Sequence, residues 1–99
     1  MIELVKTFNQ IGVVGVDSGT LIILDPGNIE DNFESWDEGL CDKVISLTDN
    51  EKQAGQFNYK RGHAGLAVVF NSGMGDGIYP VYAHYLGDKI TKIEIVFND

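Results

Sequence analysis

Two short stretches rich in glycine and aspartate decide the fold: Gly15-Val16-Asp17-Ser18-Gly19-Thr20 and Ser72-Gly73-Met74-Gly75-Asp76-Gly77. Each stands between runs of β-branched and other apolar residues, which are typical of strands. Glycine supplies the positive φ angles that tight connections between strands need. The two stretches therefore predict a small protein built mainly of β-strands.

The first stretch predicts a β-hairpin. Strands over residues 11–17 and 20–25 would be joined by the two-residue loop Ser18-Gly19. That loop sets a register in which Val16 faces Leu21, so that apolar residues occupy both faces of the ribbon. A ribbon that is apolar on both faces indicates a central place in a sandwich, or a sheet covered by a helix on one face.

The C-terminal third predicts a second hairpin. Strands over residues 78–86 and 89–97 would turn at Gly87-Asp88, with Tyr82 opposite Ile93 and His84 opposite Thr91. In this register the core face carries Tyr82, Ile93, Ile95 and Phe97, while Lys92 and Glu94 face water.

The rest of the chain adds weaker strand signals and one helix. Strands are expected over residues 2–8, 57–60 and 66–71, and a polar loop over residues 48–55. Ser35 has the position of an N-cap, and Trp36, Leu40 and Val44 follow at the spacing of an amphipathic helix. The fold class expected is therefore mainly β (α+β), a compact antiparallel sandwich or partly open barrel of about six strands with one short helix.

Composition limits the function classes. The 99 residues suit one domain, residues 1–99, with a modest core that a homodimer would extend. The formal net charge of −8 makes nucleic acid and anionic membranes unlikely ligands, because both require clustered Lys and Arg. A single cysteine excludes an intramolecular disulfide. With neither a signal-peptide pattern nor a long apolar run, a cytoplasmic protein is expected.

The motifs resemble those of a family of small uncharacterised bacterial and phage proteins, grouped as a domain of unknown function. The resemblance is carried by four motifs: Val16-Asp17-Ser18-Gly19, Asp25-Pro26, Trp36 with Cys41-Asp42, and Gly75-Asp76-Gly77-Ile78-Tyr79-Pro80-Val81-Tyr82. The chain departs from it at Gly27-Asn28, where relatives often carry a small residue and then Tyr. The resemblance implies a compact, mainly β fold of prokaryotic or phage origin, and it assigns no catalytic residue.

Three motif aspartates are the candidates for a polar site. Asp17, Asp25 and Asp76 could bind a divalent cation or share acid–base work if they converged. The strand between Asp17 and Asp25 would hold these two about 15 Å apart, because a strand rises about 3.3 Å per residue. The simpler interpretation is that the Asp17 and Asp76 carboxylates accept hydrogen bonds from backbone N–H groups in their own turns.

Two function classes follow. The first is a non-enzymatic binding module without cofactor, which holds a protein partner or a small ligand at loop 73–77 and the neighbouring tyrosines. The alternative is a small metal-assisted hydrolase or nucleotide-handling enzyme that uses the motif aspartates. The binding residues expected for the first class are Asp17, Asp25, Gly75, Asp76, Gly77, Tyr79 and Tyr82.

Overall fold

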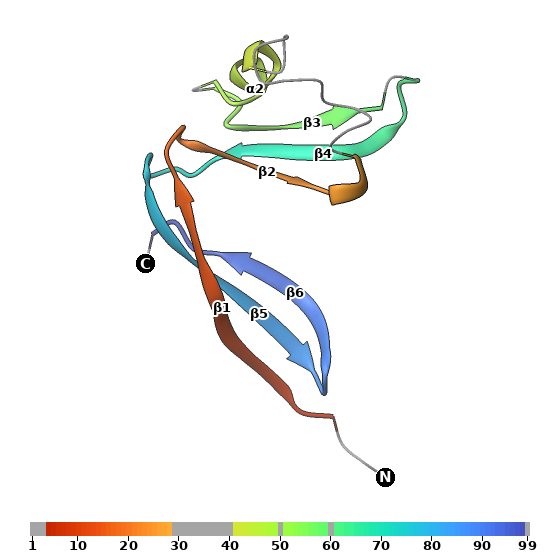
Figure 1. Cartoon of the computed structure of the whole chain (residues 1–99), viewed down its shortest axis with the longest axis vertical. Coiled ribbons are helices and arrows are strands. Elements are labelled where there is room, and N and C mark those ends of the chain that lie inside the picture. Colours follow the sequence, from red (N-terminus) through yellow and green to blue (C-terminus); the bar gives the residue numbers. More distant parts are fainter. Residues whose placement is uncertain (1–3, 29–40, 50, 60, 99) are drawn as a thin grey trace.

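The described residues of the chain form two antiparallel sheets and one short α-helix (Figure 1). The computed structural model describes residues 4–28, 41–49, 51–59 and 61–98. Its elements are β1 (Lys6–Val16), β2 (Thr20–Leu24), the 3-10 turn η1 (Pro26–Asn28), α2 (Cys41–Leu47), β3 (Ala54–Asn58), β4 (Ala64–Asn71), β5 (Gly77–Leu86) and β6 (Lys89–Ile95).

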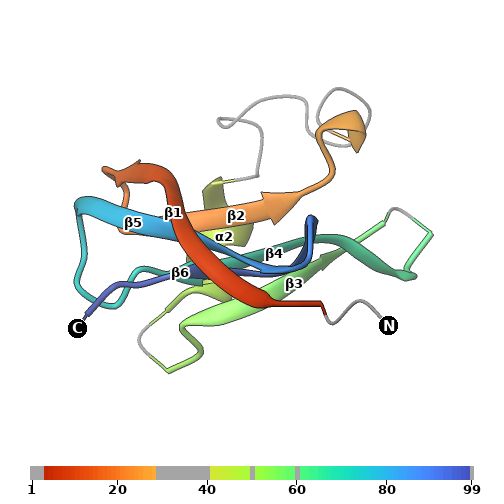
Figure 2. The same cartoon turned by 90° about the horizontal axis from the view of Figure 1, so that it is seen from below.

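The two sheets form an open sandwich. One sheet has the order β1-β5-β6 and the other β2-β4-β3. They meet where β1 passes into β2 and β4 into β5, and they diverge from that end, with α2 on the far side of the β2–β4–β3 sheet (Figures 1 and 2). The two sheets do not close into a barrel, and the predicted fold class is confirmed: mostly β, with six strands and one short α-helix among the described residues.

The apolar core lies between α2 and the β2–β4–β3 sheet. Val69, only 1% exposed, is at its centre, because the middle strand β4 is covered by neighbours on both sides. Glycine at position 55 lets Leu47 of the helix approach the sheet, since a Cβ there would lie 2.6 Å from Leu47 Cδ2. The other members of the cluster are Val44, Phe57, Leu66 and Ala67, with Leu24 and Tyr59 packed against them.

An aromatic group joins the two sheets where they meet. The Phe97 ring lies 5.1 Å from the Tyr79 ring of β5 in an edge-to-face arrangement, and 6.1 Å from the Phe70 ring of β4. These contacts identify the face of the β1–β5–β6 sheet that carries Tyr79 as its inner face. The opposite face is called the outer face below.

The predicted hairpin over residues 11–25 is wrong. β1 pairs with β5 and β2 pairs with β4, so Val16 lies opposite Gly77 and Leu21 opposite Phe70. Ser18-Gly19 is instead a corner between the two sheets, and Gly19 has the positive φ of 75° that the corner needs. The segment is apolar on both faces, but Val13 remains 61% exposed and Ile23 58% exposed.

The predicted hairpin of β5 and β6 is confirmed, and its register is correct beside the turn but wrong by one residue beyond Thr91. Tyr85 pairs with Ile90 and His84 with Lys92, so Thr91 is an extra residue in β6. This bulge moves every later pair, and Tyr82 lies opposite Glu94 rather than Ile93. Lys92 and Glu94 therefore share a face with Tyr82 and His84, instead of facing away from them.

The remaining boundaries differ in smaller ways. The two strands expected over residues 2–8 and 11–17 form the single strand β1, with an irregularity between Gln10 and Gly12. Ala54 and Gly55 were expected in a loop but begin β3. Val44 is buried as the helix pattern predicts, whereas Ser35, Trp36 and Leu40 lie outside the described residues.

Candidate functional site

The two glycine- and aspartate-rich turns lie against each other, although about fifty residues separate them in the sequence. The backbone N–H of Ser72 donates to the Gly19 carbonyl at 3.0 Å. The Asp76 Oδ1 atom lies 4.0 Å from the point where a Cβ of Gly19 would stand. The structure thus brings Asp76 to the corner that follows Asp17, at the end where the sheets meet.

The carbonyl of Gly75 is fixed by two side chains. The Ser72 hydroxyl donates to it, and so does the Tyr79 hydroxyl at 2.7 Å. Ser72 is fully buried and Tyr79 is buried against Phe97. Tyr79, expected at the binding surface, therefore holds the glycine-rich loop in shape. Gly77 lies beneath it, because a Cβ at Gly77 would stand 3.3 Å from the Tyr79 hydroxyl oxygen.

The three aspartates do not gather into one group. Asp25 follows the far end of β2, and its carboxylate accepts a hydrogen bond from the Gly27 N–H at 2.9 Å. Asp17 and Asp76 are exposed, and their carboxylates accept no hydrogen bond from the residues that the structure describes, so the turn role predicted for these two is wrong. Those residues also hold no group of three His, Cys, Asp or Glu side chains that could bind a metal ion. The hydrolase alternative gains no support from this arrangement.

The outer face of the β1–β5–β6 sheet carries a row of apolar side chains. Ile78, Pro80 and Tyr82 alternate along β5 with inward-facing residues, and Val13 lies opposite Pro80 in β1. Phe8 contacts the edge of the Tyr82 ring, with the ring centroids 6.1 Å apart. We call these five residues the outer strip. Tyr82, expected at a binding surface, belongs to it.

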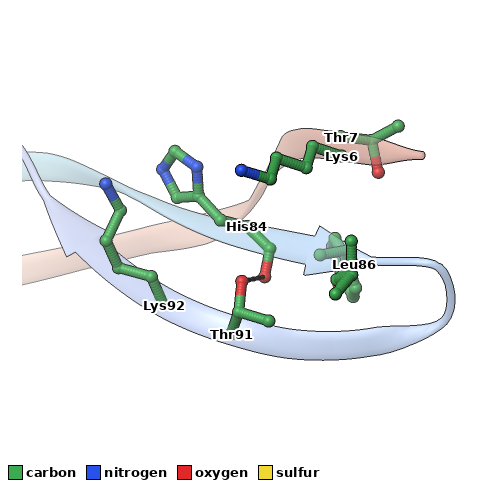
Figure 3. Close-up of a pocket in the computed structure, with 7 residues that line it drawn as sticks. Lys6, Thr7, His84, Leu86, Thr91 and Lys92 are labelled. Atoms are coloured by element: carbon green, nitrogen blue, oxygen red, sulfur yellow. Dashed lines mark hydrogen bonds between the residues drawn. The ribbon is translucent and has the colours of Figure 1, made fainter. Parts of the chain in front are cut away.

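Farther along the same face, the side chains change from apolar to cationic. Lys6 of β1, His84 of β5 and Lys92 of β6 border a shallow cavity of about 330 Å³ (Figure 3). His84 Nε2 lies 3.0 Å from Glu94 Oε1. Sequence analysis missed this group because the predicted register placed Lys92 opposite Ala83. Only the bulge at Thr91 brings Lys92 to the position opposite His84.

The fold and these surfaces define a small two-sheet antiparallel β-protein in which the helix α2 covers one sheet. The chain belongs to the family described as "Protein of unknown function (DUF4241)", whose model matches residues 7–93. The predicted membership of a domain of unknown function is thus confirmed, while the bacterial or phage origin stays a prediction. No curated protein and no solved structure matches the sequence. Among the described residues, no helix has the length and apolar character needed to cross a membrane.

Proposed function

We propose that this chain is a non-enzymatic binding module whose outer strip binds a second copy of the chain. The observation that carries the proposal is the exposure of the strip. Phe8 is 63% exposed, Val13 61% and Ile78 72%, and Pro80 and Tyr82 between them are half-buried. Contiguous apolar side chains of this size on the surface of a small domain are typical of protein interaction sites.

The accessible surface area of the chain leaves room for an interface with a second copy. The chain exposes 7478 Å². A compact monomer of 10.9 kDa is expected to expose about 5,600 Å². The radius of gyration, 16.1 Å, also exceeds the value of about 13 Å expected for a compact domain of this length. A stable interface buries about 800 Å² on each partner. The surplus is therefore large enough for one.

The distribution of charge favours the strip as the contact between two copies. Two chains that each carry a net charge of −8 repel one another. The five residues of the strip include no carboxylate, although Glu94 lies opposite Tyr82 on the same face. Lys6, Lys89 and Lys92 lie toward the other end of this face. Contact through the strip therefore brings few carboxylates together.

The experiment is sedimentation equilibrium from micromolar to millimolar concentration, on wild type and two matched variants. Ile78→Glu places a charge in the strip. Ile45→Glu is its control, because Ile45 is 60% exposed on α2, away from the strip. Burying an Ile side chain contributes about 1.5–3 kcal/mol, and a two-fold interface contains each residue twice. We therefore expect wild type and Ile45→Glu to dimerise equally, and Ile78→Glu to dimerise at least about tenfold more weakly.

Two results would overturn the proposal. One is a wild-type chain that remains monomeric over the whole concentration range. The other is an Ile78→Glu variant that dimerises as tightly as wild type.

A further inference from the structure

The cationic cavity at the end of the outer face is a second site with its own chemistry. We propose that it binds the phosphoryl group of a small phosphate monoester between Lys6, His84 and Lys92. Of the five outer-strip residues, the site uses only Phe8, whose ring stacks on the His84 ring. The proposal therefore does not depend on self-association.

The three nitrogen-bearing side chains come from three adjacent strands. Lys92 lies directly opposite His84, and Lys6 lies opposite Leu86, two residues farther along β5. Figure 3 shows the two lysine side chains and the imidazole rising from the same side of the sheet, with the imidazole between the lysines. The sheet thus fixes the spacing of the backbone positions that carry the donors.

Neither lysine has an anionic partner in the part of the chain that the structure describes. Among the described residues the ion pair joins His84 to Glu94, and none of their carboxylates lies within 4.0 Å of Lys6 or Lys92. Lys6 on β1 and Lys92 on β6 flank the central strand β5. Two cations on either side of one strand attract an anion placed between them.

The imidazole is held in place before any ligand arrives. The Phe8 ring stacks on it at 5.1 Å with an interplanar angle of 18°, and Glu94 holds its Nε2. Its Nδ1 has no hydrogen-bond partner among the described residues. When the ring carries both protons, Nε2–H donates to Glu94 and Nδ1–H is left to donate to a ligand without a further loss of side-chain freedom.

A phosphoryl group fits this set of donors better than a carboxylate. It has three terminal oxygens for two ammonium groups and one imidazole nitrogen, and lysine is a common phosphate ligand. The cavity of about 330 Å³ is at the lower end of the range for small-molecule sites. Leu86 and the lysine stems provide apolar surface for a short organic group.

The test is a titration with glycerol 3-phosphate, followed by amide NMR at constant ionic strength. The amides of residues 6–8, 84–86 and 91–92 should shift and saturate. Charge-assisted hydrogen bonds are the strong ones, so Lys92→Gln should weaken binding by about tenfold. Lys52→Gln is the matched control, because Lys52 is also exposed but lies in the turn before β3 and outside the cavity. It should bind as wild type does.

The same spectra show whether each variant is folded. The proposal is overturned if the shifts spread evenly over all lysine-bearing segments, or if Lys92→Gln binds as tightly as wild type. Acetate that produces the same shifts with the same affinity would overturn the assignment to a phosphoryl group. Repeating the titration on Ile78→Glu keeps the result separate from self-association, and the same affinity is expected there.

Discussion

The two sheets differ in what covers them. The β2–β4–β3 sheet has α2 on its outer side, and Phe57 beneath the helix is only 7% exposed. The β1–β5–β6 sheet has no described element on its outer side, and Phe8 there is 63% exposed. Phenylalanine is thus a core residue in one sheet and a surface residue in the other. The difference indicates that one sheet provides most of the stability, and that the other is available for binding.

The largest expected effect tests this division with a pair of equivalent changes. Phe57→Ala should lower the free energy of unfolding by about 3–5 kcal/mol, because it leaves a cavity in the core. Phe8→Ala should lower it by less than about 1 kcal/mol, because Phe8 is already largely hydrated. Urea unfolding of both variants at a concentration where the chain is monomeric measures the two values. Equal losses would show that the outer strip is part of the core.

A pair of glycines tests how closely each sheet is covered. Gly55→Ala should lower the free energy of unfolding by about 1–3 kcal/mol, because the new Cβ would overlap Leu47. Gly15→Ala in β1 meets nothing within 4 Å, and should leave stability unchanged or raise it by up to about 1 kcal/mol. Thermal unfolding followed by circular dichroism measures both. A neutral Gly55→Ala would mean that α2 does not pack on β3 as described.

The sequence predicted the local features of the fold well. The turn at Gly87-Asp88 brings neighbouring segments together, so the hairpin of β5 and β6 could be recognised from its loop alone. The apolar run of β4 and the burial of Val44 were equally local signals. Strand pairing over longer distances left no such signal. Ser18-Gly19 suits a hairpin loop and a corner between sheets equally well. The corner forms because β1 pairs with β5 and β2 pairs with β4, instead of β1 and β2 pairing with each other.

The candidate site was predictable to a smaller extent. The sequence singled out loop 73–77 and Tyr82, and the loop does lie beside the corner at Gly19. The sequence did not indicate that the Tyr79 hydroxyl donates a hydrogen bond to the Gly75 carbonyl, because that contact depends on how the loop folds back. The cavity at His84 depends on one extra residue in β6. A bulge has no strong sequence signature here, and a shift of one residue exchanges the two faces.

An intermediate effect is expected at the glycine-rich loop, where the two sheets meet. Ser72→Ala and Tyr79→Phe each remove one of two hydroxyl donors to the Gly75 carbonyl. Each should lower the free energy of unfolding by about 1 kcal/mol. The double variant should cost more than the sum, because it leaves the carbonyl without either donor. Urea unfolding of the four proteins in a double-mutant cycle measures the coupling. Strict additivity would contradict a shared acceptor.

The smallest effect on stability is expected at the His84–Glu94 pair, on the uncovered sheet. Both side chains are partly exposed, at 26% and 46%, and exposed ion pairs contribute about 0–1 kcal/mol. Glu94→Gln keeps an acceptor for His84 Nε2 but removes the negative charge beside the cavity. The free energy of unfolding should therefore change by less than about 1 kcal/mol. Glycerol 3-phosphate should bind to this variant more tightly than to wild type. Weaker binding by this variant would show that the Glu94 charge supports the ligand through His84 rather than opposing it.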